Sequence, residues 1–268
     1  MKDLRGAVAL LTGASRGIGP HIARALARQG VDLALVARSR PDLERVATEI
    51  RALGVRAAVV PADVGNPGAC ERIVASVEEA LGPVDLLVND AGLETVGAFV
   101  SLPTEAILET VAVNLVAAML LSRAVLPGMV ARRRGHVVNV GSIAGKKGAP
   151  YEALYSATKA GLIEWTGAMR LELDGTGVSL SVICPGLVTG EGMFARFGIP
   201  AHRTIGSCTP HQVADAVVDA IRRDRPEVIV NSVPLRPLLA IAALSPRLGA
   251  WLPKALGVTA FQRRKVGA

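Results

Sequence analysis

Short apolar runs rich in β-branched residues alternate seven times with helical stretches along this chain of 268 residues. Runs such as residues 8–11 and 86–88 are apolar throughout, not only at every second position. Strands that are buried on both faces have this pattern, as in a parallel sheet covered by helices on each side. We therefore predict an α/β fold, with a doubly wound, seven-stranded, mostly parallel sheet and helices on both faces. The expected strands cover residues 7–12, 32–37, 56–61, 84–89, 136–141, 179–184 and 227–230.

Helical stretches are expected between these strands, and proline marks where three of them begin. Pro41, Pro67 and Pro210 stand at positions where the first turn of a helix tolerates proline. In doubly wound sheets, ligands bind beyond the carboxyl ends of the strands. The glycine-rich and polar segments of this chain cluster at those positions, which favours a ligand site there. The expected helices cover residues 18–29, 41–53, 67–81, 104–133, 153–174 and 210–223.

The charge balance points to a small anionic ligand. The net charge is +7, half of the residues are hydrophobic and only 3% are aromatic. A nucleic-acid site is expected to place basic clusters among stacking aromatics, and this chain has few aromatics to offer. Its densest basic cluster, residues 132–134, lies where a helix is expected to end, and cations there interact favourably with the helix dipole. A phosphorylated small molecule is the favoured partner, and no nucleic acid is expected.

The cysteine pattern indicates a reducing compartment. Cys70, Cys184 and Cys208 are odd in number and lack metal-ligand spacing, and the four histidines are scattered. We therefore expect reduced thiols, no metal site and a cytoplasmic protein. The first residues run directly into a strand, so no secretion signal is expected. No uncharged apolar run reaches the ~18–20 residues that span a bilayer.

A glycine-rich loop, residues 12–19, joins the first expected strand to the first expected helix. Its glycines let the backbone turn sharply and approach a pyrophosphate, whose charge then meets the N-terminal end of the helix. A glycine triplet alone arises by chance in tight turns. The strand–loop–helix context makes dinucleotide binding the favoured interpretation. The loop residues assigned to the cofactor are Gly13, Ser15, Arg16, Gly17, Ile18 and Gly19.

The end of the second strand bears on the choice of dinucleotide. An NAD site places an acidic residue there, which holds the ribose 2′-hydroxyl. This chain has Ala37 followed by Arg38, and Arg16 adds a second positive charge in the loop. A guanidinium can pair with a 2′-phosphate through two hydrogen bonds. NADP(H) is therefore favoured over NAD(H), although both arginines can also be merely exposed.

Tyr155 and Lys159 stand four residues apart in an expected helix, so their side chains share one face. A free phenol has a pKa near 10, and an adjacent cation favours the phenolate and can bring proton transfer within reach of neutral pH. This spacing also occurs in solvated helices. Ser142, thirteen residues before Tyr155 and after an apolar run, raises the odds of a catalytic site. Together with the glycine loop, these residues predict a redox enzyme.

At this point the chain resembles the short-chain dehydrogenase/reductase family over about residues 4–232. The resemblance implies a Rossmann-fold catalytic and dinucleotide-binding domain, which we place at residues 1–232. Residues 233–268 lie beyond it and are expected to be an apolar extension packed on the same domain. The motifs that carry it are highly specific in this order and spacing. They comprise Gly13, Gly17 and Gly19 of the loop, the run 89–92 (NDAG), Asn114, Ser142, Tyr155 with Lys159, and Pro185-Gly186.

The resemblance implies a role for each of these residues. Tyr155 is the implied general acid in carbonyl reduction and the base in the reverse direction, and Ser142 polarises the carbonyl. Lys159 lowers the pKa of the phenol and binds the nicotinamide ribose, while Asn114 holds a water that links Lys159 to solvent. The remaining implied cofactor contacts are Asp63 and Val64 beside the adenine, Asn89, Ala91 and Gly92 at the cofactor floor, and Pro185, Gly186 and Val188 at the nicotinamide.

The chain departs from the usual family pattern at three places. The second asparagine of the family's Asn-Asn-Ala-Gly run is Asp90 here, a change that we do not expect to remove activity. Gly190 occupies a position where the family often has threonine, and Thr189 lies one place earlier, which leaves open the hydroxyl that holds the carboxamide. Pro20 directly after the glycine loop is acceptable in a first helical turn.

These observations predict an NADP(H)-dependent oxidoreductase that interconverts a ketone or aldehyde and an alcohol. Two alternatives remain, an NAD-dependent dehydrogenase of the same family and a non-catalytic dinucleotide-binding regulator. The segment 191–209 is the expected substrate lid, and a hydrophobic small molecule is the expected substrate. The apolar pocket is expected to use Leu93, Val96, Tyr151, Met193, Phe194, Phe197 and Ile199.

Two regions leave the partner surfaces open. The resemblance implies that the helices 104–133 and 153–174 pair across a homodimer or homotetramer interface, and the alternative is that both pack in the core. From Pro234 onward, four prolines interrupt an apolar stretch that ends in residues 263–265 (RRK). This tail can cap a hydrophobic pocket, contact another subunit or lie on a membrane surface. Packing on the domain is favoured, because proline disrupts a long amphipathic helix.

Overall fold

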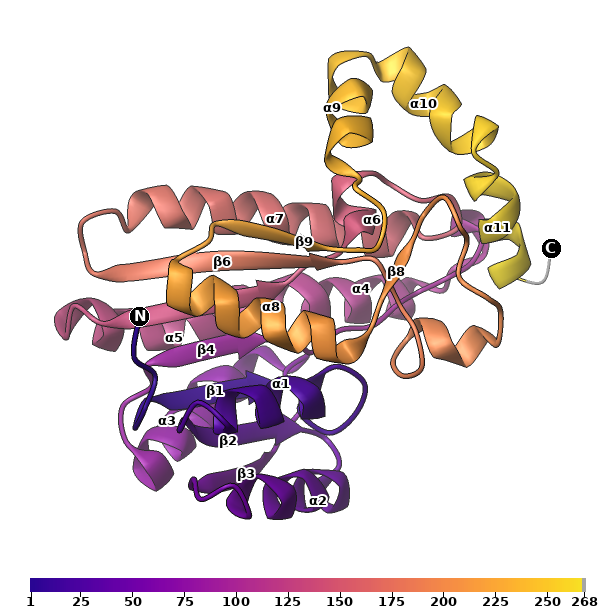
Figure 1. The fold of residues 1–268 in the computed structure, drawn as a ribbon. Coiled ribbons are helices and arrows are strands. Elements are labelled where there is room, and N and C mark those ends of the chain that lie inside the picture. The colour runs from indigo at the N-terminus through magenta and orange to yellow at the C-terminus, as the bar shows by residue number, and fades with distance from the viewer. Residues whose placement is uncertain (267–268) are drawn as a thin grey trace.

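A seven-stranded parallel sheet forms the centre of the molecule, as seen in a computed structural model that describes residues 1–266 (Figure 1). All six pairs of neighbouring strands are parallel, which confirms the predicted doubly wound sheet. The strand order reverses between β1 and β4, so the carboxyl ends of these two strands border a crevice. In spatial order the strands are β3 (Ala57–Pro61), β2 (Asp32–Ala37), β1 (Val8–Thr12), β4 (Leu86–Asn89), β5 (Gly135–Val140), β6 (Val178–Pro185) and β9 (Glu227–Val230).

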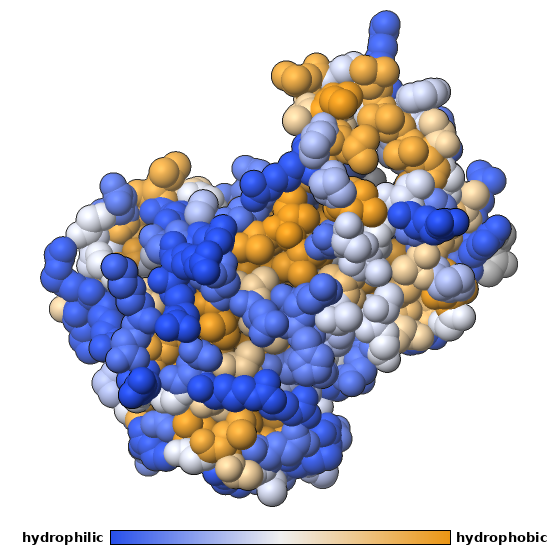
Figure 2. Space-filling model, in the orientation of Figure 1, coloured by the Kyte–Doolittle hydropathy of each residue, from blue (hydrophilic) through white to orange (hydrophobic). Residues whose placement is uncertain are grey.

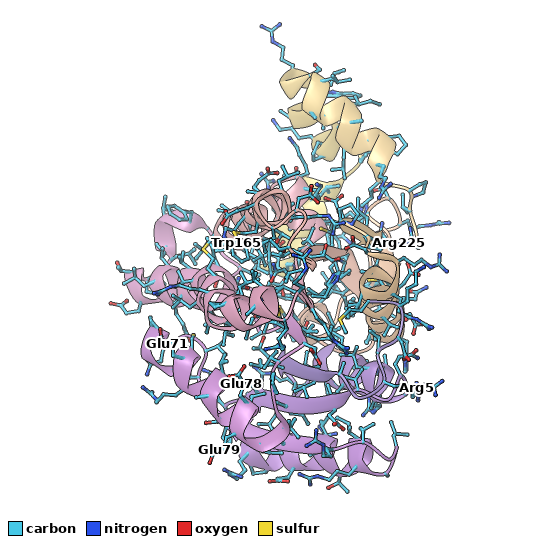
Figure 3. All side chains as sticks on the ribbon, turned by 90° about the vertical axis from the view of Figure 1, so that its left-hand side faces the viewer. Arg5, Glu71, Glu78, Glu79, Trp165 and Arg225 are labelled. Atoms are coloured by element: carbon cyan, nitrogen blue, oxygen red, sulfur yellow. The ribbon has the colours of Figure 1, made fainter. Side chains whose placement is uncertain are left out.

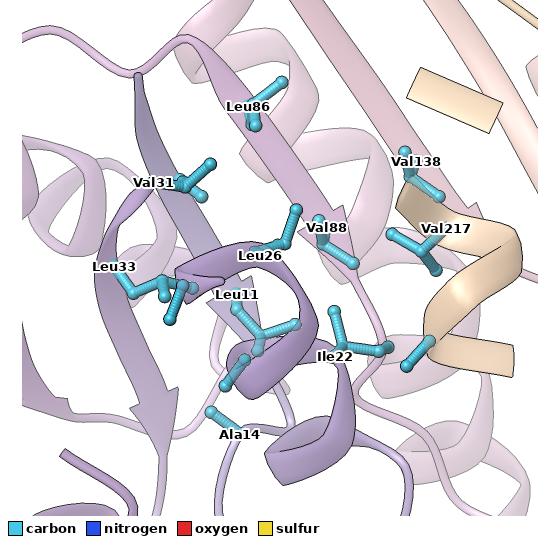
Figure 4. Packing of buried hydrophobic residues seen from close by; sticks show 14 of the residues in the cluster. Leu11, Ala14, Ile22, Leu26, Val31, Leu33, Leu86, Val88, Val138 and Val217 are labelled. Atoms are coloured by element: carbon cyan, nitrogen blue, oxygen red, sulfur yellow. The ribbon is translucent and has the colours of Figure 1, made fainter. Parts of the chain in front are cut away.

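Two helical layers cover the sheet, and successive residues of β1 point into different layers. Ala9 and Leu11 belong to the core shared with α1 (Gly19–Ala27), α2 (Arg40–Arg51) and α8 (Pro210–Arg223). Figure 4 shows Leu11 against Ile22 and Leu26 of α1. Val8 and Leu10 belong to the opposite core, with α3 (Cys70–Leu81) and α5 (Ala117–Ala131). Both faces of the sheet are therefore buried, which is why its strands are apolar throughout.

Polar caps and prolines begin the helices where the sequence predicts. Ser39 accepts a hydrogen bond from the Asp42 N–H at the start of α2, and Pro41 lies in the first turn. Thr209 and Gln212 form a reciprocal capping box that begins α8. These caps satisfy backbone donors that have no partner inside the helix. They define where α2 and α8 begin.

The helix expected over residues 104–133 is interrupted. The structure has α4 (Thr104–Val111), a π-helical turn (Ala112–Val116) and then α5. The wider turn carries Asn114, whose side chain is held by neighbouring loops, and π-helical turns often occur at functional sites. By length and composition alone, residues 104–131 could cross a membrane, because an 18-residue window within them has a mean hydropathy of 1.7; 44% of this window is buried in the protein. Its α5 portion packs on the sheet as a core helix.

The catalytic half of the sheet carries the remaining elements. Helix α6 (Ile143–Lys146) follows β5, and the long helix α7 (Ala153–Glu172) follows α6. A small parallel ribbon joins β7 (Leu187–Val188) to β8 (Ser207–Cys208). Between its strands lies the 3-10 turn Phe194–Phe197, within the segment expected to form the substrate lid. Two further 3-10 turns, Pro67–Ala69 and Phe99–Ser101, precede α3 and α4.

The C-terminal segment forms three helices after β9, namely α9 (Arg236–Leu244), α10 (Pro246–Ala255) and α11 (Val258–Lys265). Figure 1 shows α9 and α10 projecting from the body beside the carboxyl ends of the strands, while α11 returns to it. The view turned by 90° also shows the projecting segment standing clear of the body (Figure 3). Phe261, Gln262 and Lys265 of α11 are buried. The segment therefore leaves the domain at α9 and is fastened to it again at α11.

Candidate active site

The carboxyl ends of the central strands open onto one cavity of about 860 Å³. It extends from the glycine loop after β1 to the inner faces of α9 and α10. Residues far apart in the chain therefore share one cavity. The predicted site residues that line it are Gly13, Ser15, Arg16, Gly17, Ile18, Arg38, Asp63, Val64, Ala91, Gly92, Ser142, Tyr155, Lys159, Pro185, Gly186 and Val188.

The glycine loop has the backbone shape that a phosphate cradle needs. Gly13 and Gly17 have φ angles of +70° and +63°, which side chains with a Cβ rarely adopt. A Cβ on Gly13 would come within 2.8 Å of the Ala91 nitrogen, so the β1 loop and the β4 loop can approach only without it. Gly19 does not line the cavity, contrary to expectation. It begins α1, and a Cβ there would collide with the Gly13 carbonyl oxygen.

Asn89 and Asn114 also lie outside the cavity lining, and the amide nitrogens of both donate to other groups of the protein. The Asn89 amide donates to Asn139 Oδ1 at 2.8 Å beneath the cavity floor. Asn114 Oδ1 accepts from the Leu93 N–H at 2.7 Å, and Asn114 Nδ2 donates to the Leu93 carbonyl at 2.8 Å and to Thr158 Oγ1 at 3.1 Å. Asn114 therefore fastens the loop after β4 to the helix that carries Tyr155.

Tyr155 and Lys159 lie on one face of α7, as the spacing predicts. Lys159 Nζ is 5.8 Å from the centroid of the Tyr155 ring and donates to the Val140 carbonyl at 2.7 Å. Ser142 stands at the end of β5, where its Oγ accepts from the Ala144 N–H and begins α6. The three side chains thus reach the cavity from one strand end and one helix face.

Burial dominates the electrostatics of the Tyr155 phenol. Burial raises the pKa of Tyr155 well above its ordinary value, and a hydrogen bond with Ser142 opposes that rise. The nearby carboxylates of Glu94, Glu152 and Asp90 add to the rise. The buried phenol therefore holds its proton at neutral pH. The protonated phenol can act as a proton donor. Once it has given up its proton, the buried phenolate needs a positive charge or a hydrogen bond to stabilise it.

Asp90 forms an electrostatic pair with Lys159 that the sequence did not reveal. Burial lowers the pKa of Lys159 to about 8, and the Asp90 carboxylate opposes this shift. Burial likewise raises the pKa of Asp90 to about 7, and Lys159 opposes that shift. Each group thus favours the charged form of the other inside the cavity. The family's asparagine at this position would supply no such charge, so this departure bears directly on Lys159.

The substrate end of the cavity is more apolar than its floor, and its walls come from two distant segments. Of the expected pocket residues, Leu93, Met193 and Phe194 line it. Val96, Tyr151 and Phe197 line a separate depression, and Ile199 lines neither. The Gly97 N–H bonds the Tyr151 carbonyl, which holds these two loops together away from the main cavity.

The C-terminal segment forms the opposite wall, in line with one of the roles considered for it, a cap over a hydrophobic pocket. Leu235, Leu238, Leu239 and Ala242 contribute from the start and one face of α9. These positions follow the i, i+3, i+4, i+7 spacing of a helix face. Helix α10 adds Leu252 and Pro253 to the same wall, and Leu256 directly after the helix adds a third side chain. The C-terminal segment therefore encloses the end of the cavity that lies away from the glycine loop.

A buried ion cluster fastens α11 to the site, and sequence reasoning missed it. Lys265 pairs with Glu94 at 2.8 Å and with Glu152, and the three side chains are at most 8% exposed. Glu152 directly precedes α7, and Glu94 follows the Gly92-Leu93 floor. Lys265 Nζ also lies 4.7 Å from the ring centroid of Phe197 in the lid segment. One lysine thus holds together the floor, the start of the catalytic helix and the lid.

Comparison with known proteins agrees with this geometry. The model of the short chain dehydrogenase family matches residues 7–197. The chain is 42% identical over 270 residues to the ketoacyl reductase HetN of Nostoc sp., a match that covers 99% of this chain and 94% of that relative.

Two solved structures superpose on most of the chain. A metagenomic short-chain oxidoreductase in complex with NADP has a TM-score of 0.75 and 34% identity, over 85% of this chain and 98% of that chain. The actinorhodin polyketide ketoreductase with NADPH has a TM-score of 0.77 and 33% identity, over 84% and 95% of the two chains. With the matching family model and the shared fold, this protein belongs to the short-chain dehydrogenase family.

Proposed function

We propose that this protein is an NADP(H)-dependent reductase that converts a ketone on a hydrophobic molecule into a secondary alcohol. The observation that carries the proposal is one cavity lined by the glycine loop, by Ser142, Tyr155 and Lys159, and by the apolar C-terminal wall. The similarity to a ketoacyl reductase and to NADP- and NADPH-bound structures supports the same reaction.

The residues present fit a dinucleotide phosphate. The cradle at Gly13 and Gly17 lets the backbone approach a pyrophosphate. Arg16 and Arg38 line the cavity at the loop and at the end of β2, where they can meet a 2′-phosphate. Lys159 can bind the nicotinamide ribose, and Pro185, Gly186 and Val188 border the nicotinamide end. Bound NADPH supplies the hydride, while the protein supplies position and charge.

The protein's own residues then handle the proton. Tyr155 donates its phenolic proton to the carbonyl oxygen as the alcohol forms, and Ser142 hydrogen-bonds the same oxygen and the phenol. The Lys159 ammonium stabilises the resulting phenolate, and Asp90 helps to keep Lys159 charged. Asn114 holds the floor loop against α7, so the phenol and the ammonium keep their spacing. In the oxidative direction, the Tyr155 phenolate acts as the base.

Arg38→Ala is expected to weaken NADP binding about 10- to 100-fold and to change NAD binding little, since charge-assisted hydrogen bonds to phosphate are lost. Isothermal titration with both cofactors measures the two dissociation constants. Arg40→Ala is the matched control, because Arg40 is exposed and pairs with Glu44. Equal weakening of NADP and NAD by Arg38→Ala would contradict a contact with the 2′-phosphate.

We infer that the substrate is an acyl chain or a molecule of similar apolar length that carries a ketone. In a series of 3-ketoacyl thioesters, kcat/KM is expected to rise about four-fold for each added methylene until the apolar wall is covered. Leu239→Ala should flatten this rise, because Leu239 belongs to that wall. NADPH consumption measures both slopes. A panel in which short polar sugars are the best substrates would overturn the assignment.

A further inference from the structure

The hairpin of α9 and α10 exposes apolar side chains that a folded domain ordinarily buries. Every residue of α9 except Arg236 is apolar, yet none of its residues is buried. Ile241, Leu244, Leu248 and Trp251 are 44%, 87%, 47% and 59% exposed. Helices that are apolar all round are normally enclosed by protein or lipid. Figure 2 shows apolar surface gathered over this projecting segment.

The hairpin has two apolar faces, and only one of them is turned to the protein. Leu238, Leu239 and Leu252 line the cavity. Leu244 and Trp251 do not, and they remain exposed on the part of the molecule that stands clear of the body in Figures 1 and 3. The outer face thus has no partner among residues 1–266. Contiguous exposed apolar surface of this kind marks an interaction site.

The charge of the C-terminal segment is of one sign. After Glu227 the chain has six lysines and arginines and no acidic residue. Lys265 is buried in its ion cluster. The other five are exposed, and none forms an ion pair within the described part of the chain; they are Arg236, Arg247, Lys254, Arg263 and Arg264.

We propose that the outer face of the α9–α10 hairpin docks on the surface of an anionic lipid bilayer. Leu244 and Trp251 enter the boundary between headgroups and acyl chains, and the exposed cations meet the anionic headgroups. A second copy of this chain fits the face less well. A symmetric contact would bring the same cations of both copies together without an acidic residue to pair with them.

Docking of the α9–α10 hairpin on a bilayer would also give a hydrophobic substrate a route into the cavity. The inner face of the hairpin lines the substrate cavity while its outer face lies in the headgroup region. The two faces are separated only by the thickness of a helix, about 10 Å. A hydrophobic substrate dissolved in the bilayer then reaches the cavity without crossing bulk water. The docking itself does not depend on the proposed reaction, because it uses residues outside the cavity lining.

Vesicle flotation of the whole protein tests the docking. Wild type should float with vesicles of phosphatidylcholine containing about 30% phosphatidylglycerol, and less with phosphatidylcholine alone or at high salt. Leu244→Glu should lower the bound fraction about ten-fold, since it replaces an inserted apolar side chain with a charge. Leu171→Glu is the matched control, because Leu171 is 79% exposed near the end of α7, outside the hairpin. It should float like wild type.

Tryptophan emission gives a second measure of docking that is independent of flotation. In a Trp165→Phe background, emission from Trp251 should shift to shorter wavelength on addition of the anionic vesicles. Thermal unfolding confirms that each variant is folded. Absence of wild-type binding to both vesicles overturns the proposal, as does equal binding of Leu244→Glu and Leu171→Glu. If wild type binds no vesicles but forms a dimer, and Leu244→Glu abolishes that dimer, then the face belongs to a contact with a second copy instead.

Discussion

Tyr155→Phe is expected to lower kcat for ketone reduction about 1,000-fold, within the range that general acid catalysis contributes. The substitution removes the phenolic oxygen and leaves the ring, Ser142 and Lys159 in the cavity. Burial keeps the Tyr155 phenol protonated at neutral pH. The substitution therefore deprives the carbonyl oxygen of its proton donor. The dissociation constant of NADPH should stay within about three-fold of wild type, since the phosphate cradle is untouched. NADPH consumption and isothermal titration measure the two quantities.

Tyr151 provides the matched control for this variant. It is the chain's only other tyrosine, and it lines the neighbouring depression and not the main cavity. Tyr151→Phe should therefore turn over a ketone substrate at nearly the wild-type rate. Full turnover by Tyr155→Phe, or an equal loss in both variants, would contradict the role of Tyr155 as proton donor. Tight NADPH binding without turnover by wild type on any ketone would instead favour a dinucleotide-binding regulator.

Lys265→Met is expected to lower the free energy of unfolding by about 3–5 kcal/mol, because it leaves buried carboxylates without their cation. Glu152 then has no positive partner, while Glu94 keeps Arg196 at 3.4 Å. For a chain of this length the midpoint of thermal unfolding should fall by roughly 10 °C. Denaturant unfolding and calorimetry measure the two values.

The loss of stability in Lys265→Met is expected to change with pH in one direction. Burial raises the pKa of Glu152, and Lys265 opposes that rise. Without Lys265 the folded-state pKa rises further above the unfolded value. The folded protein then binds more protons than the unfolded chain between the two values, so its stability falls as pH rises through the folded pKa. Lys265→Met should therefore lose more stability near about pH 8 than near about pH 5.

Two further variants separate charge from packing. Arg264→Met changes the neighbouring exposed cation and should leave stability within about 0.5 kcal/mol of wild type. Adding Glu152→Gln to Lys265→Met removes one unpaired carboxylate and should recover part of the loss. If Lys265→Met unfolds like wild type, or if Glu152→Gln brings no recovery, then the cluster does not hold the C-terminal segment in place.

Local sequence patterns predicted the backbone elements around the site well, because each pattern extends over only a few residues. The apolar runs predicted all seven strands of the sheet, and the loop between β1 and α1 was placed correctly. The pair Tyr155 and Lys159 lies on one helix face because four residues make about one turn. The doubly wound topology then brings the carboxyl ends of distant strands to one edge. Most predicted site residues accordingly share the cavity.

Contacts between side chains that are far apart in the sequence were not predicted, and the reason is physical. The hydrogen bonds between the Asn114 side chain and the backbone of Leu93, 21 residues earlier, were not predicted. The Lys265 partners lie 171 and 113 residues earlier in the chain, and no periodic pattern links such distant positions. For the C-terminal segment, the sequence left open a pocket cap, a subunit contact and a membrane contact, and only the packed structure shows which residues of α9 line the cavity. These contacts depend on how the finished elements pack.

The sequence by itself determined the parallel sheet, the phosphate-binding loop and the one-turn spacing of phenol and ammonium, because each follows from backbone periodicity over a few residues. Tertiary structure decided which groups tune those side chains and what encloses the substrate. Desolvation sets the pKa values of Tyr155, Lys159 and Asp90, and it exists only once the cavity has closed around them. The outward apolar face of α9 and α10 likewise appears only when the inner face has packed over the cavity.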